Sequence, residues 1–355
     1  MIEIDGSYGE GGGQILRTSV SLSAITLRPI KIKNIRSGRP KPGLKRQHMA
    51  GIELTGRLVN AEIKGLEIGS TEVEFIPSSR SGGRFDYDIG TAGSISLVLQ
   101  AVLPPAILSK DPISFHLRGG TDVAWSPSID YFIEVFSFML TKMGAQVGIL
   151  QNQRGHYPKG GGKVDVNVTP IDSFSSVTLQ EFEKPYSISG ISHCVRLPSH
   201  VAERQARAAE KILRNHGFEI GKIRCESFPK QKDPHLGAGS GIVLWAESSN
   251  GMRIGSDALG KRGKPAEKVG SEVATNLIQE LATNQTVDSH LCDMLVPYMA
   301  LAEGVSEMKV TEITSHLMTN IWVAERILGI EANVVGQVGM PGLLSIKGSG
   351  FSLTQ

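Results

Sequence analysis

The feature that most limits how this chain can fold is an order of predicted elements that occurs twice in succession. Residues 2–76 and residues 85–168 each predict a strand, a helix, a strand, a helix and two further strands, with glycine- or proline-rich loops between them. Repetition at roughly 80 residues indicates one structural unit that is used more than once. The last part of the chain, from about Ser289 to Ile346, predicts most of a third copy.

Between the second and third copies the order of elements changes. Residues 186–285 predict a strand, a helix with many charges, three strands and a final helix. Because the repeat resumes after this segment, we interpret it as an inserted domain. The expected fold is therefore α/β (α+β), with three βαβαββ-type units around a pseudo-threefold axis and an inserted smaller α/β domain. We expect residues 1–185 and 286–355 to form the domain of three units, and residues 186–285 to form the insertion.

The composition narrows the class of protein. The chain has 355 residues, of which 40% are apolar and 20% charged, as in a globular protein. Its net charge of +2 is too small for the protein as a whole to attract nucleic acid electrostatically, so any RNA contact must come from local clusters of cationic residues. Cys194, Cys225 and Cys292 form no CxxC pair, which favours a reducing compartment and argues against a zinc site. Without a signal peptide or an uncharged run of about 18 residues, we expect a cytoplasmic protein that enters no membrane.

A glycine-rich turn with one carboxylate joins the first predicted strand to the first helix. Residues 5–14 read DGSYGEGGGQ. A strand, a glycine turn and a helix N-terminus suit a bound anion, because glycine lets backbone N–H groups approach a phosphate closely. A carboxylate in such a turn favours a cation beside the anion, so Glu10 is a candidate Mg²⁺ or Mn²⁺ ligand next to a nucleotide. The alternative is a flexible turn with a solvated glutamate, and the turn matches neither a GxxxxGK[ST] loop nor a GxGxxG fingerprint.

Equivalent loops of repeated units can converge at one end of a molecule. The second loops of the three units are residues 36–43, 119–127 and 314–318. The first carries Arg36, Arg39 and Lys41 on a backbone stiffened by proline, which favours a presented cationic surface over an ordinary solvated face. The third carries His316, which can attack phosphorus as a neutral imidazole near pH 7. An ordinary surface histidine is the alternative.

One glycine-rich segment of the second copy carries a resemblance to a known family. Residues 154–164 read RGHYPKGGGKV and resemble the signature of the RNA 3′-terminal phosphate cyclases, (Arg/His)-Gly-x-x-Pro-x-Gly-Gly-Gly-x-aliphatic. The opening segment from Asp5 to Gln14, with Arg17, is similar to the N-terminus of that family. Further similarities follow in order along nearly the whole chain, at Arg36-Ser37-Gly38-Arg39, Pro42-Gly43-Leu44, Arg46-Gln47-His48, Gly119-Gly120-Thr121-Asp122, Arg196-Leu197-Pro198, His200 to Arg204 and His316 to Asn320.

The resemblance implies the three-unit fold with an inserted domain, and an ATP-dependent reaction on RNA. In such a reaction a histidine attacks the α-phosphorus of ATP, the AMP passes to an RNA 3′-terminal phosphate, and the neighbouring 2′-OH displaces AMP to close a 2′,3′-cyclic phosphate. The partners that the resemblance implies are ATP and RNA with a 3′-terminal phosphate, and the cofactor is Mg²⁺ or Mn²⁺. The resemblance is also compatible with a homodimer.

The resemblance also assigns roles to individual residues, with His316 at the adenylylated histidine and Glu10 at the metal-contacting carboxylate. The positions that it implies for ATP binding are Gln100, Pro127, His290, Leu291, Cys292, Asp293 and Met294. Those that it implies for phosphate or RNA binding are Arg17, Arg36, Arg39, Gln47 and His48. His290 and Met294 depart from bacterial members, which have a tyrosine and a glutamine there. Imidazole can still stack on adenine, whereas a thioether cannot replace the hydrogen bonds of an amide.

Two other functions belong to related proteins. One branch of the family consists of non-catalytic RNA-binding factors for ribosome assembly, which lack the nucleophilic histidine that His316 supplies here. Enolpyruvyl transferases contain similar repeat units, but they need six units and this sequence predicts three. We therefore expect a cyclase of the catalytic branch.

Overall fold

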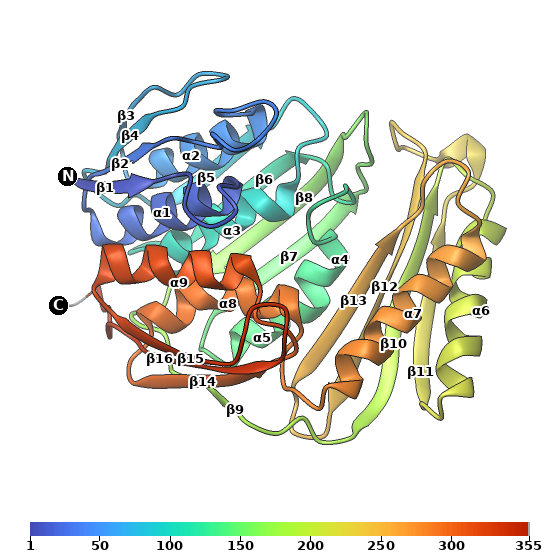
Figure 1. Cartoon of the computed structure of the whole chain (residues 1–355). Coiled ribbons are helices and arrows are strands. Elements are labelled where there is room, and N and C mark those ends of the chain that lie inside the picture. The colour runs from blue at the N-terminus through green and yellow to red at the C-terminus, as the bar shows by residue number, and fades with distance from the viewer. Residues whose placement is uncertain (354–355) are drawn as a thin grey trace.

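Three units with the same order of elements make up most of the molecule (Figure 1). A computed structural model describes residues 1–353, apart from the side chains of Pro185 and Tyr186. The first unit consists of β1 (Ile2–Asp5), α1 (Gly13–Thr26), β2 (Ile30–Lys33), α2 (Arg46–Leu58), β3 (Glu62–Lys64) and β4 (Val73–Ile76). The second consists of β5 (Gly83–Asp88), α3 (Ile95–Ile107), β6 (Ile113–Gly119), α4 (Ile129–Tyr131), a π-helical segment (Phe132–Ser137), α5 (Phe138–Thr141), β7 (Gln146–Gln153) and β8 (Gly162–Thr169). The third consists of β9 (Thr178–Leu179), α8 (Ser289–Leu301), β14 (Val305–Val310), α9 (Ser315–Leu328), β15 (Glu331–Val335) and β16 (Gly342–Lys347).

Each unit folds into a four-stranded sheet with one topology. The strand orders are β1-β2-β4-β3, β5-β6-β8-β7 and β9-β14-β16-β15. In every sheet the first two strands are parallel, and the remaining pairs are antiparallel. The predicted α/β fold class with three βαβαββ units is therefore confirmed.

The first strand of the third unit, β9, is separated from the rest of that unit by the insertion. It has only two residues, Thr178 and Leu179, which pair in parallel with β14. Two residues are too few for alternation to be visible, so the sequence showed the third copy without its first strand. The insertion thus interrupts the third unit after its first strand.

The helices of the three units pack against one another, and the sheets lie outside them. Helix α1 contacts α2, α3 and α9, and α8 contacts α3 and α9. Strand β8 alternates buried and exposed side chains, as expected for a sheet with one face against helices. Helices α3 and α8 are apolar on almost all sides, which is typical of helices inside a core. Polar residues on these two helices are therefore the ones that need an explanation.

The insertion forms a sheet of its own with a separate apolar core. Its elements are β10 (Pro185–Val195), α6 (His200–Asn215), β11 (Ile220–Ser227), a 3-10 turn (Lys230–Lys232), β12 (Gly239–Ser248), β13 (Arg253–Leu259) and α7 (Ala266–Ala282). The strand order is β11-β10-β12-β13, with α6 and α7 on one face (Figure 1). At the boundary with the second unit, the Arg253 guanidinium lies 3.6 Å from the centre of the Phe138 ring, and Ser128 N donates to Asp257 Oδ2 at 2.7 Å.

The helix predicted over residues 128–143 is less regular than its sequence pattern indicates. Ser128 caps it, since its Oγ accepts a hydrogen bond from Tyr131 N, but the helix changes to π geometry over Phe132–Ser137. Apolar periodicity does not distinguish an α-helix from a helix with one π segment. Over residues 1–353, no helix is both long and apolar enough to cross a bilayer.

Two glycines inside helices allow a test of this packing. A Cβ at Gly270 of α7 would lie 2.0 Å from the carbonyl oxygen of Gln205 on α6, whereas a Cβ at Gly51 of α2 would lie 3.5 Å from the Ala101 Cβ. Gly270→Ala should lower the free energy of unfolding by about 1–3 kcal/mol because the two helices must separate. Gly51→Ala should be neutral or raise it by up to about 1 kcal/mol, because alanine favours a helix. Urea unfolding of both variants measures the difference, and a stabilised Gly270→Ala protein would contradict the close approach of α6 to α7.

Candidate functional site where the first and third units meet

The glycine turn after β1 ends at a helix N-terminus that no side chain caps. Gly9 and Gly11 have φ angles of +59° and +57°, which other residues adopt only at a cost. Gly12 is the N-cap of α1, and no side-chain hydrogen bond closes the first turn. The first N–H groups of α1, together with the positive end of the helix dipole, therefore suit an anion.

Helix α9 holds this turn in place. The Tyr8 ring stacks on the Trp322 ring, with centroids 4.2 Å apart and planes 9° apart. A Cβ at Gly9 would lie 2.6 Å from Thr319 Oγ1, so only glycine lets the turn approach the helix this closely. The turn is thus packed against the third unit and is not a flexible loop on the first.

This packing brings Glu10 and His316 together from the two ends of the chain. His316 lies in the first turn of α9, and its Nε2 is 3.6 Å from Glu10 Oε2. Arg39 Nη2 approaches the same carboxylate oxygen at 3.4 Å. The side chains of His316, Glu10 and Arg39 are each a little over 40% exposed, at 44%, 42% and 44%, so all three are accessible to a substrate.

The surroundings of His316 favour its neutral form. Burial lowers the pKa of His316, and the cationic groups of Arg17 and Arg39 lower it further, whereas Glu10 acts in the opposite direction. A neutral imidazole keeps one nitrogen lone pair free for attack on an electrophile. The equivalent loops predicted that His316 and the cationic loop converge, and the structure brings His316 and Arg39 to the same Glu10 carboxylate oxygen.

A buried polar network below the site connects α1 to α9 and α8. Asn320 Oδ1 accepts hydrogen bonds from Gln14 Nε2 at 2.9 Å and from Thr18 Oγ1 at 2.6 Å. Asn320 Nδ2 donates to the carbonyl oxygen of Asp293 at 2.7 Å. Thr314, the N-cap of α9, donates through Oγ1 to Asp293 Oδ1 at 2.5 Å. Burial raises the pKa of Asp293 to about 7, although the bond from Thr314 opposes the shift.

Arg17 connects this network to α3. Its Nε donates to Gln100 Oε1 at 3.1 Å, and its Nη2 donates to Gln14 Oε1. Burial lowers the pKa of Arg17 to about 10, which leaves the guanidinium charged at neutral pH. A small cleft is lined by Arg17, Gln100, Asp293 and Met294, together with Gln14, Thr18 and mostly apolar neighbours. Four of the residues predicted for the site therefore face one space.

A second small cleft shares Arg17 and is also lined by Gln47 and His48. Burial, with nearby cations, lowers the pKa of His48 to about 3, so its imidazole is neutral. Its Nδ1 accepts a hydrogen bond from Lys45 N at 3.2 Å, which leaves the proton on Nε2. That Nε2 would be 2.6 Å from a Cβ on Gly13, so it faces the first turn of α1. Gln47 instead holds the start of α3, since its Oε1 accepts from Ser94 N at 3.0 Å.

The two arginines of the cationic loop occupy different positions. Arg36 is 8% exposed, has a φ of +54°, and donates through Nη1 to the carbonyl oxygens of Lys41 and Gly43 at 2.8 Å each. Arg39 is half exposed and faces Glu10. Arg36 thus holds the shape of the loop, and Arg39 is presented from it. The sequence could not separate the two, because both stand among the same glycines and prolines.

The remaining predicted residues lie on α8 and on the loop before α4. His290 is exposed, with its ring 6.3 Å from that of Tyr131, whereas Leu291 and Cys292 are completely buried in the core. The carbonyl oxygen of Pro127 accepts a hydrogen bond from Ser96 Oγ at 2.7 Å. In the same loop Trp125 is 99% exposed, which the sequence analysis did not single out.

A half-exposed carboxylate next to an anion site suits a divalent cation when the phosphates of a bound substrate supply further oxygen ligands. Mg²⁺ and Mn²⁺ prefer oxygen ligands, and proteins commonly bind Mg²⁺ with one or two carboxylates while substrate phosphates and water complete the shell. Glu10 fits that description. His316 and Arg39 stand close enough to the carboxylate to face whatever is bound there.

Fold and site together define a protein of three α/β repeat units whose polar site forms where helices of the first and third units meet. The family model for RNA 3′-terminal phosphate cyclase matches residues 8–334. The chain belongs to the RNA 3′-terminal phosphate cyclase family and is an enzyme of that family.

Its relatives match it over almost their whole length. The RNA 3′-terminal phosphate cyclase of Methanopyrus kandleri is 48% identical over 350 residues, which cover 99% of both chains. That of Pyrococcus furiosus is 51% identical over 342 residues, covering 96% of this chain and 97% of the relative. A solved structure, the enolpyruvyl transferase NikO from Streptomyces tendae, aligns with 98% of this chain and 48% of its own, with a TM-score of 0.41 and 10% identity.

The different positions of Arg36 and Arg39 predict different effects of the same substitution. Arg36→Lys should lower the free energy of unfolding by about 1–3 kcal/mol, because the lysine side chain is shorter and its ammonium cannot reach the position from which Nη1 donates to both carbonyl oxygens. Arg39→Lys should change it by no more than about 0.5 kcal/mol, because the side chain is half exposed. Urea unfolding at one pH measures both variants. Equal stability of the two would show that Arg36 does not hold the loop.

Proposed function

We propose that this enzyme converts the 3′-terminal phosphate of RNA to a 2′,3′-cyclic phosphodiester in an ATP-dependent reaction through a covalent histidyl-AMP. The observation that supports the proposal most directly is the position of His316, whose Nε2 lies 3.6 Å from Glu10 Oε2, while the glycine turn of Glu10 leads into the uncapped N-terminus of α1. The names of the relatives support the class of substrate and product.

In the first step the lone pair of the His316 Nε2 attacks the α-phosphorus of ATP. A P–N bond forms, the P–O bond to the β-phosphate breaks, and pyrophosphate leaves with the bonding electrons. The lowered pKa of His316 keeps the nitrogen unprotonated for this attack. Arg39 and the N–H groups at the start of α1 are positioned to stabilise the negative charge that develops on the leaving group.

In the second step an oxygen of the RNA 3′-phosphate attacks the phosphorus of the histidyl-AMP, and the P–N bond breaks to regenerate a neutral imidazole. In the third step the 2′-OH oxygen attacks the 3′-phosphorus, AMP leaves, and the hydroxyl proton passes to solvent. The activation is needed because a phosphate monoester has no good leaving group. The final attack is fast once AMP is attached, because the 2′-OH is already held next to the phosphorus.

Glu10 is the residue proposed to hold Mg²⁺ or Mn²⁺. When bound, the cation would neutralise charge on the phosphate oxygens of the nucleotide. Arg39 Nη2, at 3.4 Å from Glu10 Oε2, keeps the carboxylate directed toward the site.

The nucleotide is proposed to lie between the starts of α1, α3 and α8. Gln100, Asp293 and Met294 line the first cleft next to Arg17, and the exposed His290 offers a ring for stacking on the base, with Pro127 on the loop before α4. Because the side chains of Leu291 and Cys292 are buried, these two residues are expected to act through the position of the backbone only. The Arg17 guanidinium and the neutral side chains of Gln47 and His48, which line the second cleft, are proposed to face the phosphates.

Labelling with ATP tests the covalent step. The full-length enzyme, incubated with α-labelled ATP and Mg²⁺, should give a labelled band on a denaturing gel that acid removes and alkali does not, as expected for a phosphoramidate. His316→Ala should abolish the band. His290→Ala is the matched control, because this second histidine lies near the proposed nucleotide and should leave the band in place. His316→Ala should still cyclise a chemically prepared RNA(3′)pp(5′)A, since that step needs no attack by the enzyme.

The opposite pattern would overturn the assignment. An adduct that persists in His316→Ala and disappears in His290→Ala would show that the nucleophile is wrong. Failure to convert any of several 3′-phosphorylated RNAs, with intact RNA binding, would instead favour a non-catalytic RNA-binding role.

The pH dependence of adduct formation reports on the surroundings of His316. Because the pKa of His316 is lowered from the ordinary 6.5, the imidazole should stay neutral at pH 6.5, and the rate should fall only at lower pH. Glu10 acts to raise this pKa, so Glu10→Gln should move the acid limb of the profile further down. Single-turnover rates between pH 4.5 and 8 give the midpoint. A midpoint at or above the ordinary value would mean that burial does not control this histidine.

A further inference from the structure

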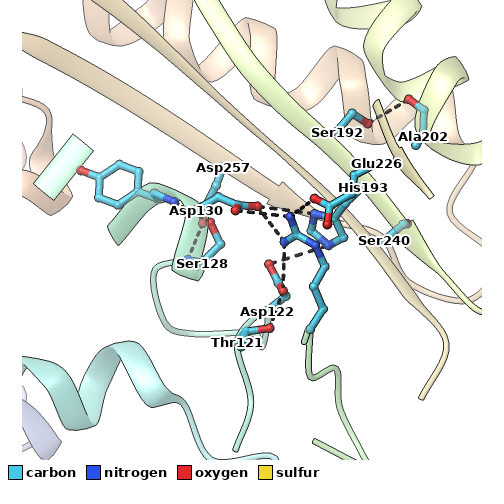
Figure 2. A network of polar contacts seen from close by, with 12 residues as sticks. Thr121, Asp122, Ser128, Asp130, Ser192, His193, Ala202, Glu226, Ser240 and Asp257 are labelled. Atoms are coloured by element: carbon cyan, nitrogen blue, oxygen red, sulfur yellow. Dashed lines mark hydrogen bonds and ion pairs between the residues drawn. The ribbon is translucent and has the colours of Figure 1, made fainter. Parts of the chain in front are cut away.

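A second polar cluster lies at the boundary between the second unit and the inserted domain, and the proposed reaction does not use it. Asp122 is in the loop after β6, His156 is in the loop after β7, and His193 is on β10 of the insertion. Figure 2 shows Asp122 and Asp130 from the second unit facing His193 and Glu226 from the inserted sheet. The cluster includes part of the glycine-rich segment 154–164, which the nucleotide site does not contain.

Three potential metal ligands converge here in a buried position. Asp122, His156 and His193 are only 2%, 6% and 1% exposed. One ligand atom from each lies within 4.8 Å of those of the other two. His193 Nε2 is 3.7 Å from Asp122 Oδ1, and two ligands of one tetrahedral zinc ion would be about 3.4 Å apart. Small side-chain adjustments therefore suffice to place one ion between them.

The same atoms lack hydrogen-bond partners within the described part of the chain. They are Asp122 Oδ1, His156 Nε2 and both ring nitrogens of His193. Native proteins rarely leave several buried polar atoms unpaired at one place, because each has lost its bonds to water. The second oxygen of Asp122 is occupied, since Thr121 Oγ1 donates to Oδ2 at 2.6 Å. The carboxylate is thus held by the hydrogen bond at Oδ2, while its Oδ1 has no hydrogen-bond partner among the described residues.

The charges around the cluster also favour a cation. Arg154 donates to Asp130 Oδ2 at 2.7 Å and to Glu226 Oε2 at 2.6 Å, and it lies 3.5 Å from Asp122 Oδ2. Three carboxylates therefore surround one guanidinium. Neutral imidazole and carboxylate are the forms that bind a metal.

The inserted sheet has two glycines where the imidazoles lie. A Cβ at Gly239 would be 2.1 Å from His156 Cγ, and a Cβ at Gly241 would be 2.8 Å from His193 Cε1. Both glycines are on β12, two residues apart, and so belong to one face of the sheet. Any other residue at either position would displace a ligand. Asp130 Oδ2 lies 3.7 Å from His193 Nδ1, where a carboxylate can orient a histidine that binds metal through its other nitrogen.

We propose that Asp122, His156 and His193 form a binding site for one zinc-like divalent transition-metal ion, which joins the inserted domain to the second unit. Two imidazoles and one carboxylate suit Zn²⁺ or a late first-row ion, whereas Mg²⁺ prefers an octahedral shell of oxygens. The absence of CxxC pairs in the sequence excludes a cysteine-rich site, but it has no bearing on this one. The site is separate from Glu10, so it does not depend on the proposed function.

Metal titration of the whole protein tests the proposal. Chelator-treated enzyme, without ATP, should bind one Zn²⁺ per chain with a Kd below about 1 µM in competition with a chromophoric chelator. Excess Mg²⁺ should not displace it. Co²⁺ should give the intense visible absorption of a low-coordinate ion. Glu10→Gln should leave all three results unchanged.

Two ligand variants and one control locate the ion. His193→Gln and His156→Gln should each weaken Zn²⁺ binding by more than about 100-fold. The matched control is His116→Gln, which removes a histidine whose Nδ1 is 2.7 Å from Asp165 Oδ1 on a partly exposed sheet surface, and it should bind Zn²⁺ as the wild type does. Zn²⁺ should raise the Tm of the chelator-treated wild type, which keeps the test valid if a ligand variant does not fold. A wild type without a submicromolar zinc site, or an equal loss in His116→Gln, would overturn the proposal.

Discussion

The hydrogen bonds of Asn320 join the first and third units, and the arrangement of the site depends on them. Asn320 is completely buried on α9, and it receives bonds from Gln14 and Thr18 of α1 while it donates to the backbone of α8. An amide offers both donors and an acceptor, so one side chain can join its own helix to two others. Breaking such a buried network would leave polar groups without partners and would cost free energy. The intact network therefore fixes the relative positions of the helix N-termini.

The site then follows from what those helix ends carry. Helix α1 presents an uncapped N-terminus behind a glycine turn, and α9 presents His316 from its first turn. The stack of Tyr8 on Trp322 holds the turn against α9. Partial burial lowers the pKa of His316, and the nearby Arg17 and Arg39 lower it further, so the same cationic side chains that suit a phosphate also favour the neutral imidazole.

The insertion brings a second cluster of buried polar residues to its boundary with the second unit. It enters the third unit after β9 and returns at α8, so the three sheets keep one topology despite the interruption. Its own sheet packs against the second unit at a boundary that is partly apolar, through contacts such as Gly255 on the Tyr131 ring, and partly ionic, around Arg154. Buried ions and imidazoles are uncommon at such a boundary, because desolvation must be offset by close partners. The unpaired atoms of this cluster are the basis for assigning a metal ion to it.

The repeat, the fold class and most of the elements can be predicted from the amino-acid sequence, because periodicity, glycine turns and prolines act within short segments. The glycine turn and the equivalent loops also indicate Glu10 and His316 as candidates. The packing of the units was needed to show that Arg36 is bonded inside its own loop while Arg39 is presented, and that Leu291 and Cys292 belong to the core. The two-residue strand β9, the partners of Asn320 and the Asp122, His156 and His193 cluster were also beyond the sequence. Each depends on contacts between segments far apart in the chain, and the distances between such segments are set by how the units pack and not by any local pattern.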